Sequence, residues 1–304
     1  MGKKVVVIGA GFAGLTAARE LQTAGIDYVV LEATNRIGGR AYTEERMGRP
    51  LELGATWVHW FQAHIWTEIM RYGQRLEIEA SPAGNDAYWI TEGKVVEGTE
   101  DELDEKLTAA IEATHKDSAE YFPNPYDPLW ILSDAYDGPE EVRERFLADD
   151  YKNAIDVVRE AGFDQARWAR GSTRPESGRA TRAGGKETID LIDAFWCAGY
   201  IGDPYTGSAL MAKQWGALSD GKYRLMEDIT LKWKLKNGMQ SIYNGIANDL
   251  TGEIRLETPV VKIDHHDNGA TVTTEAGEVI EADAVICTAP VGALDNIEFT
   301  PQLS

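Results

Sequence analysis

The amino-acid sequence predicts an α/β protein in which the two ends of the chain form one domain and the middle forms a second, mostly helical domain. Three observations support this class. A glycine-rich turn joins an apolar run to a helical pattern near the N-terminus, helical patterns fill the middle, and a strand-like run, "ADAVICTAP" (282–290), returns near the end. We place the first domain at residues 1–75 and 239–304, and the inserted domain at residues 76–238.

A strand, a helix and a second strand are predicted at the N-terminus. The continuous apolar run 5–8 is typical of a strand that is covered on both faces. Apolar residues then recur at helical spacing over residues 12–21, and Gly25 marks the end of that helix. The run 28–31 predicts a second strand, which ends in Glu32.

The turn between the first strand and the helix has the spacing of a Rossmann-type dinucleotide site, because Gly9, Gly11 and Gly14 follow G-x-G-x-x-G. Gly9 permits the tight turn, Gly11 lets a pyrophosphate approach the backbone, and Gly14 allows close packing of the helix on the strand. The helix N-terminus offers N–H groups to phosphates. Glu32 can accept hydrogen bonds from ribose hydroxyls and would repel a 2′-phosphate, which disfavours NADP. A glycine-rich turn without a ligand is the alternative.

A second glycine turn favours FAD over NAD. In "NRIGGRAYT" (35–43), Gly38 and Gly39 would allow close approach of a cofactor, and Arg40 can neutralise a pyrophosphate. NAD enzymes have no general need for this second turn. The stretch "LELGATWVH" (51–59) follows it.

Together, "VVVIGAGFAGL" (5–15), "VVLEATNRIGGRAYT" (29–43) and "LELGATWVH" resemble the flavin-containing amine oxidase family, which includes monoamine oxidases, polyamine oxidases and bacterial nicotine- and putrescine-oxidising enzymes. Residues 235–290 continue the resemblance, whereas the middle of the chain resembles the family poorly. Thr34 stands where many members of the family have an arginine, which removes one possible phosphate contact.

The resemblance implies noncovalent FAD as the cofactor. Residues 54–57 would run beneath the flavin ring, and the backbone of Val260 would meet the adenine. The residues that would hold FAD are Gly9, Gly11, Gly14, Glu32, Ala33, Gly38, Gly39, Arg40, Gly54, Ala55, Thr56, Trp57 and Val260. The residues assigned to a substrate cavity are His59, Trp60, Trp196 and Tyr200, although core packing is the favoured role for the last two. No catalytic residue is assigned.

The inserted domain is predicted to begin with a hairpin at 85–98 and to continue with helices at 101–122 and 138–162. The segment 187–203 resembles the helix of the family that leads toward the substrate cavity. A proline-broken connection, "FPNPYDP" (122–128), separates the first two helices.

A basic segment, "RWARGSTRPESGRATRAGGK" (167–186), is set in this domain and contains a single acidic residue, Glu176. It is either a mobile loop, which its composition favours, or a docking site for an acidic partner.

Charge and cysteine content limit the setting of the protein. A formal net charge of -20 would repel the phosphates of nucleic acids, so no nucleic-acid partner is expected. No apolar run has the length needed to cross a bilayer, so no membrane association is expected either. Cys197 and Cys287 are too few and too far apart for a disulfide framework, and the histidines lack metal-ligand spacing. We therefore expect a reduced, cytoplasmic setting and no metal.

The expected reaction, implied by the resemblance, is oxidation of an amine C–N bond by hydride transfer from the amine-bearing carbon to flavin N5. Members of the family continue beyond "TAPVGAL" (288–294) with a segment that supplies further active-site residues. We therefore expect the protein to be the large chain of a heteromer, in which a second polypeptide completes the flavin site. The alternatives are a dehydrogenase or desaturase of a non-amine substrate, a non-catalytic FAD-binding subunit, or a truncated fragment.

Overall fold

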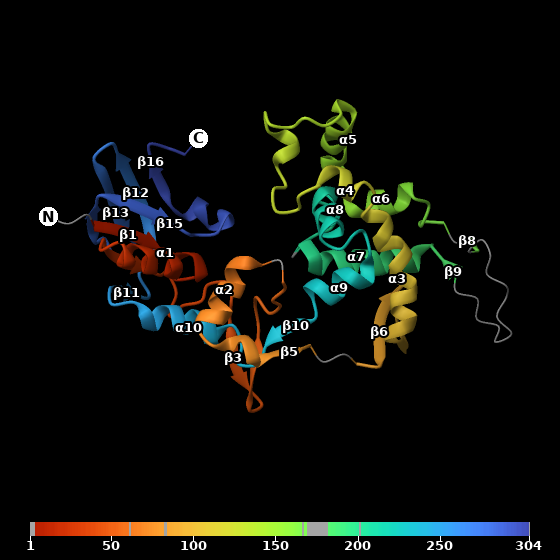
Figure 1. Ribbon diagram of the computed structural model, residues 1–304, viewed down its shortest axis with the longest axis horizontal. Helices are drawn as coiled ribbons and strands as arrows, with labels where there is room; N and C mark the ends of the chain where they lie inside the picture. Colours follow the sequence, from red (N-terminus) through yellow and green to blue (C-terminus); the bar gives the residue numbers. More distant parts are fainter. Residues whose placement is uncertain are drawn as a thin grey trace. The chain divides into compact units, whose positions relative to one another are not determined.

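The computed structural model describes residues 4–60, 62–81, 84–165, 167–168, 182–200 and 202–303. The chain divides into two compact units, which we call the terminal unit (Met1–Ala80 with Trp233–Ser304) and the inserted unit (Ser81–Lys232). In Figure 1 the terminal unit is red, orange and blue, and the inserted unit runs from yellow through green to cyan. The assignment of these units as FAD-binding and substrate domains stays a prediction.

The terminal unit is built on a parallel sheet with the strand order β11-β2-β1-β15. Its strands are β1 (Lys4–Ile8), β2 (Asp27–Leu31), β11 (Glu253–Arg255) and β15 (Ala284–Cys287). Helix α1 (Phe12–Thr23) connects β1 to β2, as the spacing of the apolar residues predicts. Val6 and Val7 are fully buried, because β1 is central and covered on both faces.

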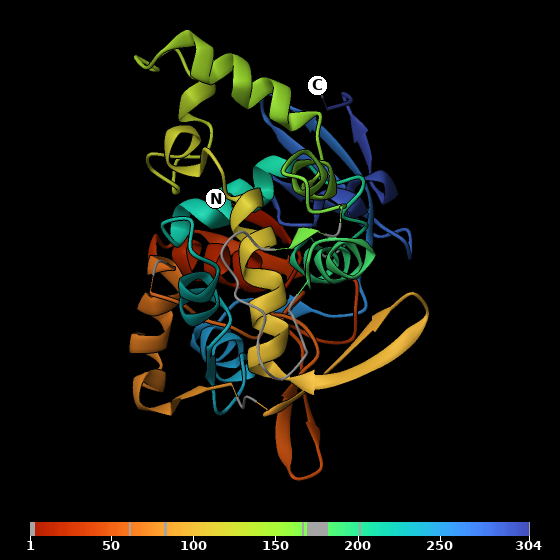
Figure 2. The ribbon, with the colours of Figure 1, turned by 90° about the vertical axis from the view of Figure 1, so that its right-hand side faces the viewer.

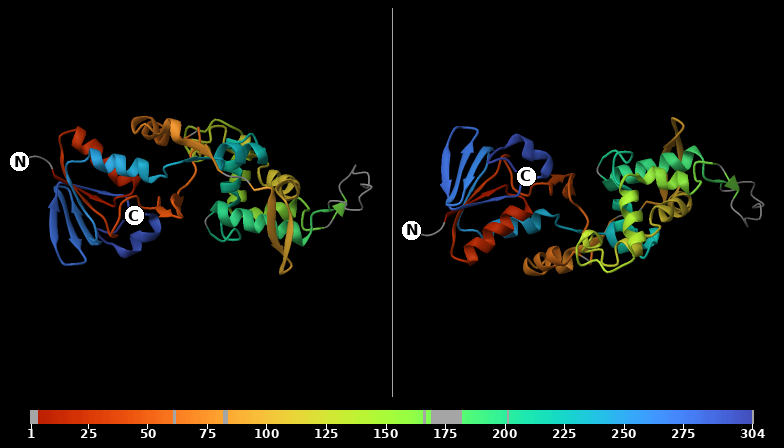
Figure 3. Two further views of the ribbon diagram at one scale, coloured as in Figure 1. Left: turned by 90° about the horizontal axis from the view of Figure 1, so that it is seen from below. Right: turned by 90° about the horizontal axis from the view of Figure 1, so that it is seen from above.

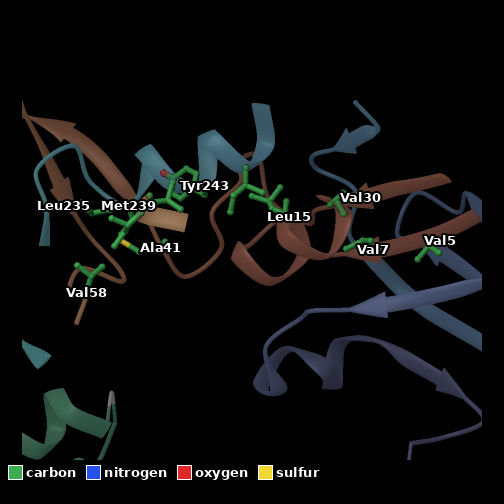
Figure 4. Close-up of a cluster of buried hydrophobic side chains, with 14 residues drawn as sticks. Val5, Val7, Leu15, Val30, Ala41, Val58, Leu235, Met239 and Tyr243 are labelled. Atoms are coloured by element: carbon green, nitrogen blue, oxygen red, sulfur yellow. The ribbon is translucent and has the colours of Figure 1, made fainter. Parts of the chain in front are cut away.

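Alternate residues of β1 point to two different layers, as the period of a strand requires. Val5 and Val7 pack with Leu15 of α1 and with Ile242 of α10 (Gln240–Asp249), as the close-up in Figure 4 shows for the labelled side chains. Val6 and Ile8 pack instead against a second sheet. Figure 3 shows α1 and α10 on one side of the red strands and the second sheet, in blue, on the other.

The second sheet has the order β14-β13-β12-β16. Its strands are β12 (Val260–His266), β13 (Gly269–Thr274), β14 (Val279–Ala282) and β16 (Glu298–Thr300). The smaller elements of the terminal unit are β3 (Thr43–Arg46), β4 (Arg49–Glu52), α2 (Ala63–Arg71), η1 (Gln74–Glu77), β5 (Ile78–Ala80), β10 (Trp233–Leu235) and η3 (Val291–Asn296). A buried Arg19 joins three helices, since it forms a forked ion pair with Glu68 of α2 and contacts Tyr72, which donates to Asp249 of α10.

The inserted unit begins with the predicted hairpin, formed by β6 (Asp86–Thr91) and β7 (Lys94–Thr99). Glu92 and Gly93 both have positive φ, as a two-residue hairpin turn requires. The hairpin packs on α3 (Glu100–Thr114) and α7 (Lys186–Tyr200), and its place beside α3 is visible in Figure 2. The other elements are α4 (Ser118–Tyr121), η2 (Trp130–Leu132), α5 (Glu140–Asp150), α6 (Ala154–Glu160), β8 (Arg167–Trp168), β9 (Arg182–Ala183), α8 (Ala209–Leu218) and α9 (Tyr223–Thr230).

Two predicted helices of this unit are each divided. The segment 138–162 forms α5 and α6 rather than one helix, because Asn153 and Asp156 make a reciprocal capping box that starts a new helix. The segment 101–122 forms α3 and α4, separated at Asp117, which has a φ of 67°. Most of the basic segment 167–186 lies outside the described residues.

Candidate functional site

The first glycine turn joins β1 to α1 in a conformation that only glycine adopts readily. Gly9 has a φ of 101° and donates to the carbonyl of Leu31 at 2.8 Å. A Cβ on Gly14 would lie 1.8 Å from the carbonyl oxygen of Gly9, so the helix can approach the turn only with glycine at this position. Gly11 is the N-cap of α1 and no side chain caps it, which leaves the helix N-terminus open to an anion.

Glu32 lies beside this turn and is 8% exposed. Its Oε2 accepts a hydrogen bond of 2.7 Å from the backbone N–H of Ala10. Its Oε1 accepts from the backbone N–H of Thr34 at 2.9 Å and from the Thr34 hydroxyl at 2.8 Å. The acidic end of β2 therefore contacts the glycine turn, as the predicted dinucleotide site requires, and the adjacent Ala33 is exposed.

The second glycine turn packs directly on the first. Gly38 has a φ of 99° and donates to the carbonyl of Ala10 at 2.9 Å, and Gly39 has a φ of 59°. A Cβ on Gly39 would lie 3.0 Å from the Cα of Gly11, so the two turns meet backbone to backbone. The structure thus brings together two glycine clusters that lie more than twenty residues apart in the sequence.

Arg36 holds the second turn, a role that the sequence analysis missed. Its guanidinium donates to the carbonyls of Ile37 and Ala41 at 3.2 Å and of Gly39 at 2.8 Å. It also lies 4.3 Å from the ring centroid of Tyr42. A tight turn leaves several carbonyls without partners, and an arginine just before Gly-Gly was the available signal. Arg40, predicted to neutralise a pyrophosphate, is exposed.

Residues 54–57 run beside Arg40. A Cβ on Gly54 would lie 2.1 Å from the carbonyl oxygen of Arg40, to which Ala55 donates at 3.0 Å. The Thr56 hydroxyl donates to the carbonyl of Gly54 at 3.0 Å, and Trp57 forms a bridge with Lys234. The close approach of the Arg40 carbonyl therefore requires glycine at position 54, whether or not a flavin lies nearby.

Val260, the remaining predicted cofactor residue, begins β12 and is buried. The segment before it is joined to the end of β2 by two backbone hydrogen bonds. The N–H of Thr258 donates to the carbonyl of Glu32 at 2.8 Å, and the N–H of Glu32 donates to the carbonyl of Arg255 at 2.8 Å. The start of β12 therefore lies close to Glu32 in the structure.

His59 and Trp60 line a pocket of the terminal unit with a volume of about 10 Å³. Its lining residues are Val58, His59, Trp60, Trp66, Ile78 and Trp233. Burial lowers the pKa of His59, which favours the neutral imidazole at pH 7. Trp60 and Trp66 meet edge to face at 4.7 Å. The volume is that of about one water molecule, so a substrate would need these side chains to move.

Trp196 and Tyr200 lie on α7 of the inserted unit. Trp196 has no exposed surface and belongs to the hydrophobic core of that unit, which favours packing over substrate contact. Tyr200 stacks on Trp196 at 5.4 Å and donates to the carbonyl of Ser208 at 3.1 Å, and burial raises the pKa of its phenol.

Taken together, the terminal unit's site fits a dinucleotide. An uncapped helix N-terminus, two glycine turns in backbone contact and a carboxylate all lie at the carboxyl ends of parallel strands, where ligands of open α/β sheets bind. Within the described residues, no group of three or more histidine, cysteine, aspartate or glutamate side chains could hold a metal ion. In that same part of the chain, we find no helix with both the length and the apolar character needed to cross a membrane.

Comparison with curated proteins gives relatives whose names describe dehydrogenases of nicotine and pseudooxynicotine and oxidases of polyamines. The chain is 31% identical over 300 residues to a pseudooxynicotine dehydrogenase of a Pseudomonas species, covering 98% of this chain and 54% of that protein. It is 29% identical to nicotine dehydrogenase of Pseudomonas putida, covering 99% and 56%, and 28% identical to polyamine oxidase 4 of Oryza sativa, covering 98% and 54%. The chain thus spans about half the length of these curated relatives.

Solved structures share the fold. Wild-type putrescine oxidase bound to putrescine matches with a TM-score of 0.68 at 24% identity, covering 100% of this chain and 62% of that one. Cyclohexylamine oxidase from Brevibacterium oxydans matches with a TM-score of 0.69 at 22% identity, covering 100% and 61%. The predicted α/β class is confirmed, and the first sheet of the terminal unit is parallel. The family model described as flavin containing amine oxidoreductase matches residues 12–304, and the chain therefore belongs to the flavin-containing amine oxidoreductase family.

Proposed function

We propose that this chain binds FAD noncovalently and takes part in the oxidation of an amine C–N bond. The observation that supports this proposal is the contact of Glu32 with the first glycine turn, because a carboxylate beside an open helix N-terminus could accept a hydrogen bond from a ribose hydroxyl, and the chain belongs to the amine oxidoreductase family. FAD held by these residues would supply a hydride acceptor for the amine-bearing carbon, and the imine product would hydrolyse.

Each part of the terminal unit would have its own task in holding FAD. The uncapped N–H groups at the start of α1 donate to phosphate oxygens, and the missing side chain of Gly11 lets the pyrophosphate approach them. The exposed guanidinium of Arg40 adds a positive charge. Glu32 orients the ribose. Residues 54–57 would run beneath the flavin ring, and Val260 would border the adenine.

The pocket at His59 supports an apolar or aromatic amine as the substrate class. A neutral imidazole does not repel an ammonium group, and the indole faces of Trp60 and Trp66 attract one. The printed names nicotine dehydrogenase and pseudooxynicotine dehydrogenase support an aromatic amine, and polyamine oxidase supports an amine in the broader sense. Either oxygen or another acceptor would reoxidise the flavin.

The proposal is tested by anaerobic reduction. The purified, flavin-loaded protein is mixed with a panel of primary, secondary and tertiary amines, and each amine is matched with the alcohol or hydrocarbon of the same shape. We expect the absorbance of the oxidised flavin to fall with at least one amine and to persist with its matched control. Reduction by non-amine substrates alone would instead support a dehydrogenase or desaturase, and no reduction by either would support a non-catalytic FAD-binding subunit.

The second polypeptide and the cytoplasmic setting stay predictions. Native mass spectrometry of the protein from its own source, beside a denaturing gel, tests the first of them. A second chain in the flavin-containing complex would support the heteromer, and a single chain that binds flavin and is reduced by an amine would contradict it.

A further inference from the structure

Thr34 is an exposed residue with several polar contacts. Its N–H and its hydroxyl both reach the same carboxylate oxygen, Oε1 of Glu32, at 2.9 and 2.8 Å. The hydroxyl also lies 3.0 Å from the carbonyl oxygen of Arg36, so Glu32 and Arg36 share its single proton. Its carbonyl accepts a hydrogen bond of 2.9 Å from the N–H of Glu257. Thr34 is therefore fixed on both sides, by the carboxylate it contacts and by the segment that leads into β12.

These bonds decide what the Glu32 carboxylate can still do. A carboxylate offers about four acceptor positions, two on each oxygen. While the Thr34 hydroxyl donates to Oε1, that oxygen accepts two hydrogen bonds from Thr34, and Oε2 accepts one from Ala10. In this arrangement one position remains, on Oε2, so Glu32 presents a single directed acceptor to a ligand rather than a freely rotating carboxylate.

The segment opposite Thr34 is held in an uncommon conformation. Glu257 has a φ of 51°, in the left-handed region that non-glycine residues rarely adopt. Its N–H bond to Thr34 and the neighbouring bond from Thr258 to the carbonyl of Glu32 tie this segment to the end of β2. The backbone that carries Thr34 is thus supported by a part of the chain more than two hundred residues away.

We propose that Thr34 is a positioning residue that fixes the side-chain conformation of Glu32 and thereby sets the affinity for the adenosine half of FAD. This inference rests on the proposed function, because it concerns the same site. A hydroxyl at position 34 holds Oε1 away from the ligand, which directs the remaining position of Oε2 toward it and lowers the conformational entropy lost on binding. Thr34 itself need not touch the cofactor.

The inference is tested by measuring the Kd of FAD through the change in flavin fluorescence, for the wild type, Thr34→Val and Thr34→Ser. Valine keeps the shape and the N–H bond but removes the hydroxyl, whereas serine keeps the hydroxyl. We expect Thr34→Val to weaken FAD binding about tenfold, since one hydrogen bond to a charged group is lost, and Thr34→Ser to restore most of the affinity. The Kd of FMN, which lacks the adenosine half, should not change between the variants.

A double-mutant cycle with Glu32→Ala, which removes every acceptor from this side chain, shows whether Thr34 acts through the carboxylate. We expect Thr34→Val to weaken FAD binding in the wild-type background and to have no further effect once Glu32 is alanine. Circular dichroism melting of each variant controls for folding.

The outcomes separate the two claims. Equal FAD affinity for the wild type and Thr34→Val, or equal weakening for FAD and FMN, would overturn the inference while leaving the FAD site in place. A folded wild-type protein that binds no FAD would overturn the proposed function itself.

Discussion

The hydroxyl of Thr288 donates a 2.8 Å hydrogen bond to the carbonyl of Ile8, although the two residues lie 280 positions apart in the sequence. The hydroxyl oxygen of Thr288 lies 2.6 Å from where a Cβ of Gly9 would be and 3.1 Å from the corresponding position of Gly14. Thr288, which follows β15, therefore packs directly against the first glycine turn, and the turn depends on both ends of the chain.

Replacing Thr288 by valine should lower the free energy of unfolding and weaken the binding of FAD at the first glycine turn. The carbonyl of Ile8 would keep its bond from the Thr288 N–H, at 2.9 Å, but would lose the hydroxyl. We expect a loss of about 1 kcal/mol in unfolding free energy, measured by urea titration of the terminal unit's signal, with a higher Kd for FAD. Thr288→Ser, which keeps the hydroxyl, is the control, and equal behaviour of the two variants would show that the hydroxyl has no role.

Replacing Gly14 by alanine should abolish flavin binding. The added Cβ would lie 1.8 Å from the carbonyl oxygen of Gly9, so the helix must move away from the turn. Gly292→Ala is a matched control, because a Cβ there meets nothing within 4 Å. Flavin content after gel filtration measures the effect. Normal flavin content in Gly14→Ala would contradict the close packing of α1 on the turn.

The ion pair of Arg19 and Glu68 should contribute strongly to the stability of the terminal unit. The two side chains are 7% and 12% exposed, so Arg19→Met leaves a buried carboxylate with only its longer contact to Arg71, at a cost of up to about 3 to 5 kcal/mol. Arg71 contacts the same Glu68 at 3.6 Å but is 46% exposed, and Arg71→Met should cost less than about 1 kcal/mol. Similar losses for the two variants in urea unfolding would contradict this difference.

The same pair predicts a loss of stability in acid. The hydrogen bond from Arg19 lowers the pKa of Glu68, so its contribution is complete above the pKa of the unfolded state and is lost as the pH falls through the folded-state pKa. Arg19→Met should remove this part of the pH dependence.

His115 should make the inserted unit less stable as the pH falls below 6.5, a less acidic range than the one in which Glu68 acts. Its ring is 3% exposed and its Nδ1 lies 3.2 Å from the carbonyl of Gly221, which can only accept, so Nδ1 carries the proton. Burial lowers the pKa of His115 below the ordinary value of 6.5. The unfolded state then binds more protons, and stability falls as the pH drops below 6.5. Thermal unfolding between neutral pH and pH of about 5 should show this slope in the wild type and lose it in His115→Gln. An unchanged slope would contradict it.

A positive charge at position 59 should weaken the binding of a cationic amine. In His59→Lys an ammonium lines the pocket, and repulsion in this half-buried site should raise the amine concentration for half-maximal flavin reduction by about tenfold or more. His64→Lys, on the exposed side of α2, is the matched control and should change little. Equal effects of both lysines would show that the pocket does not receive the amine.

The parts of the site that could be predicted from the sequence are those whose residues lie close together along the chain. The first glycine turn and Glu32 follow a spacing in which every member has a local task, and the second turn was found by its Gly-Gly pair. Thr288 and Glu257 could not be found in this way, because their contacts join residues that are distant in the sequence.

Other features had a local signal that was missed. The sequence "NAID" (153–156) contains the capping box that divides the predicted helix 138–162, and Arg36 precedes a turn with several carbonyls to satisfy. Trp196 lies in the core of the inserted unit, but an aromatic residue suits a cavity and a core equally well, so the sequence alone does not separate the two roles.

The most direct measurement is the identification of the flavin released from the purified, native protein by heat denaturation, using chromatography beside authentic FAD, FMN and riboflavin, with the protein quantified in the same sample. The glycine turns and Glu32 predict FAD, close to one molecule per chain, and its loss in Gly14→Ala. A folded protein that releases no FAD and takes none up from solution would contradict the proposed cofactor site.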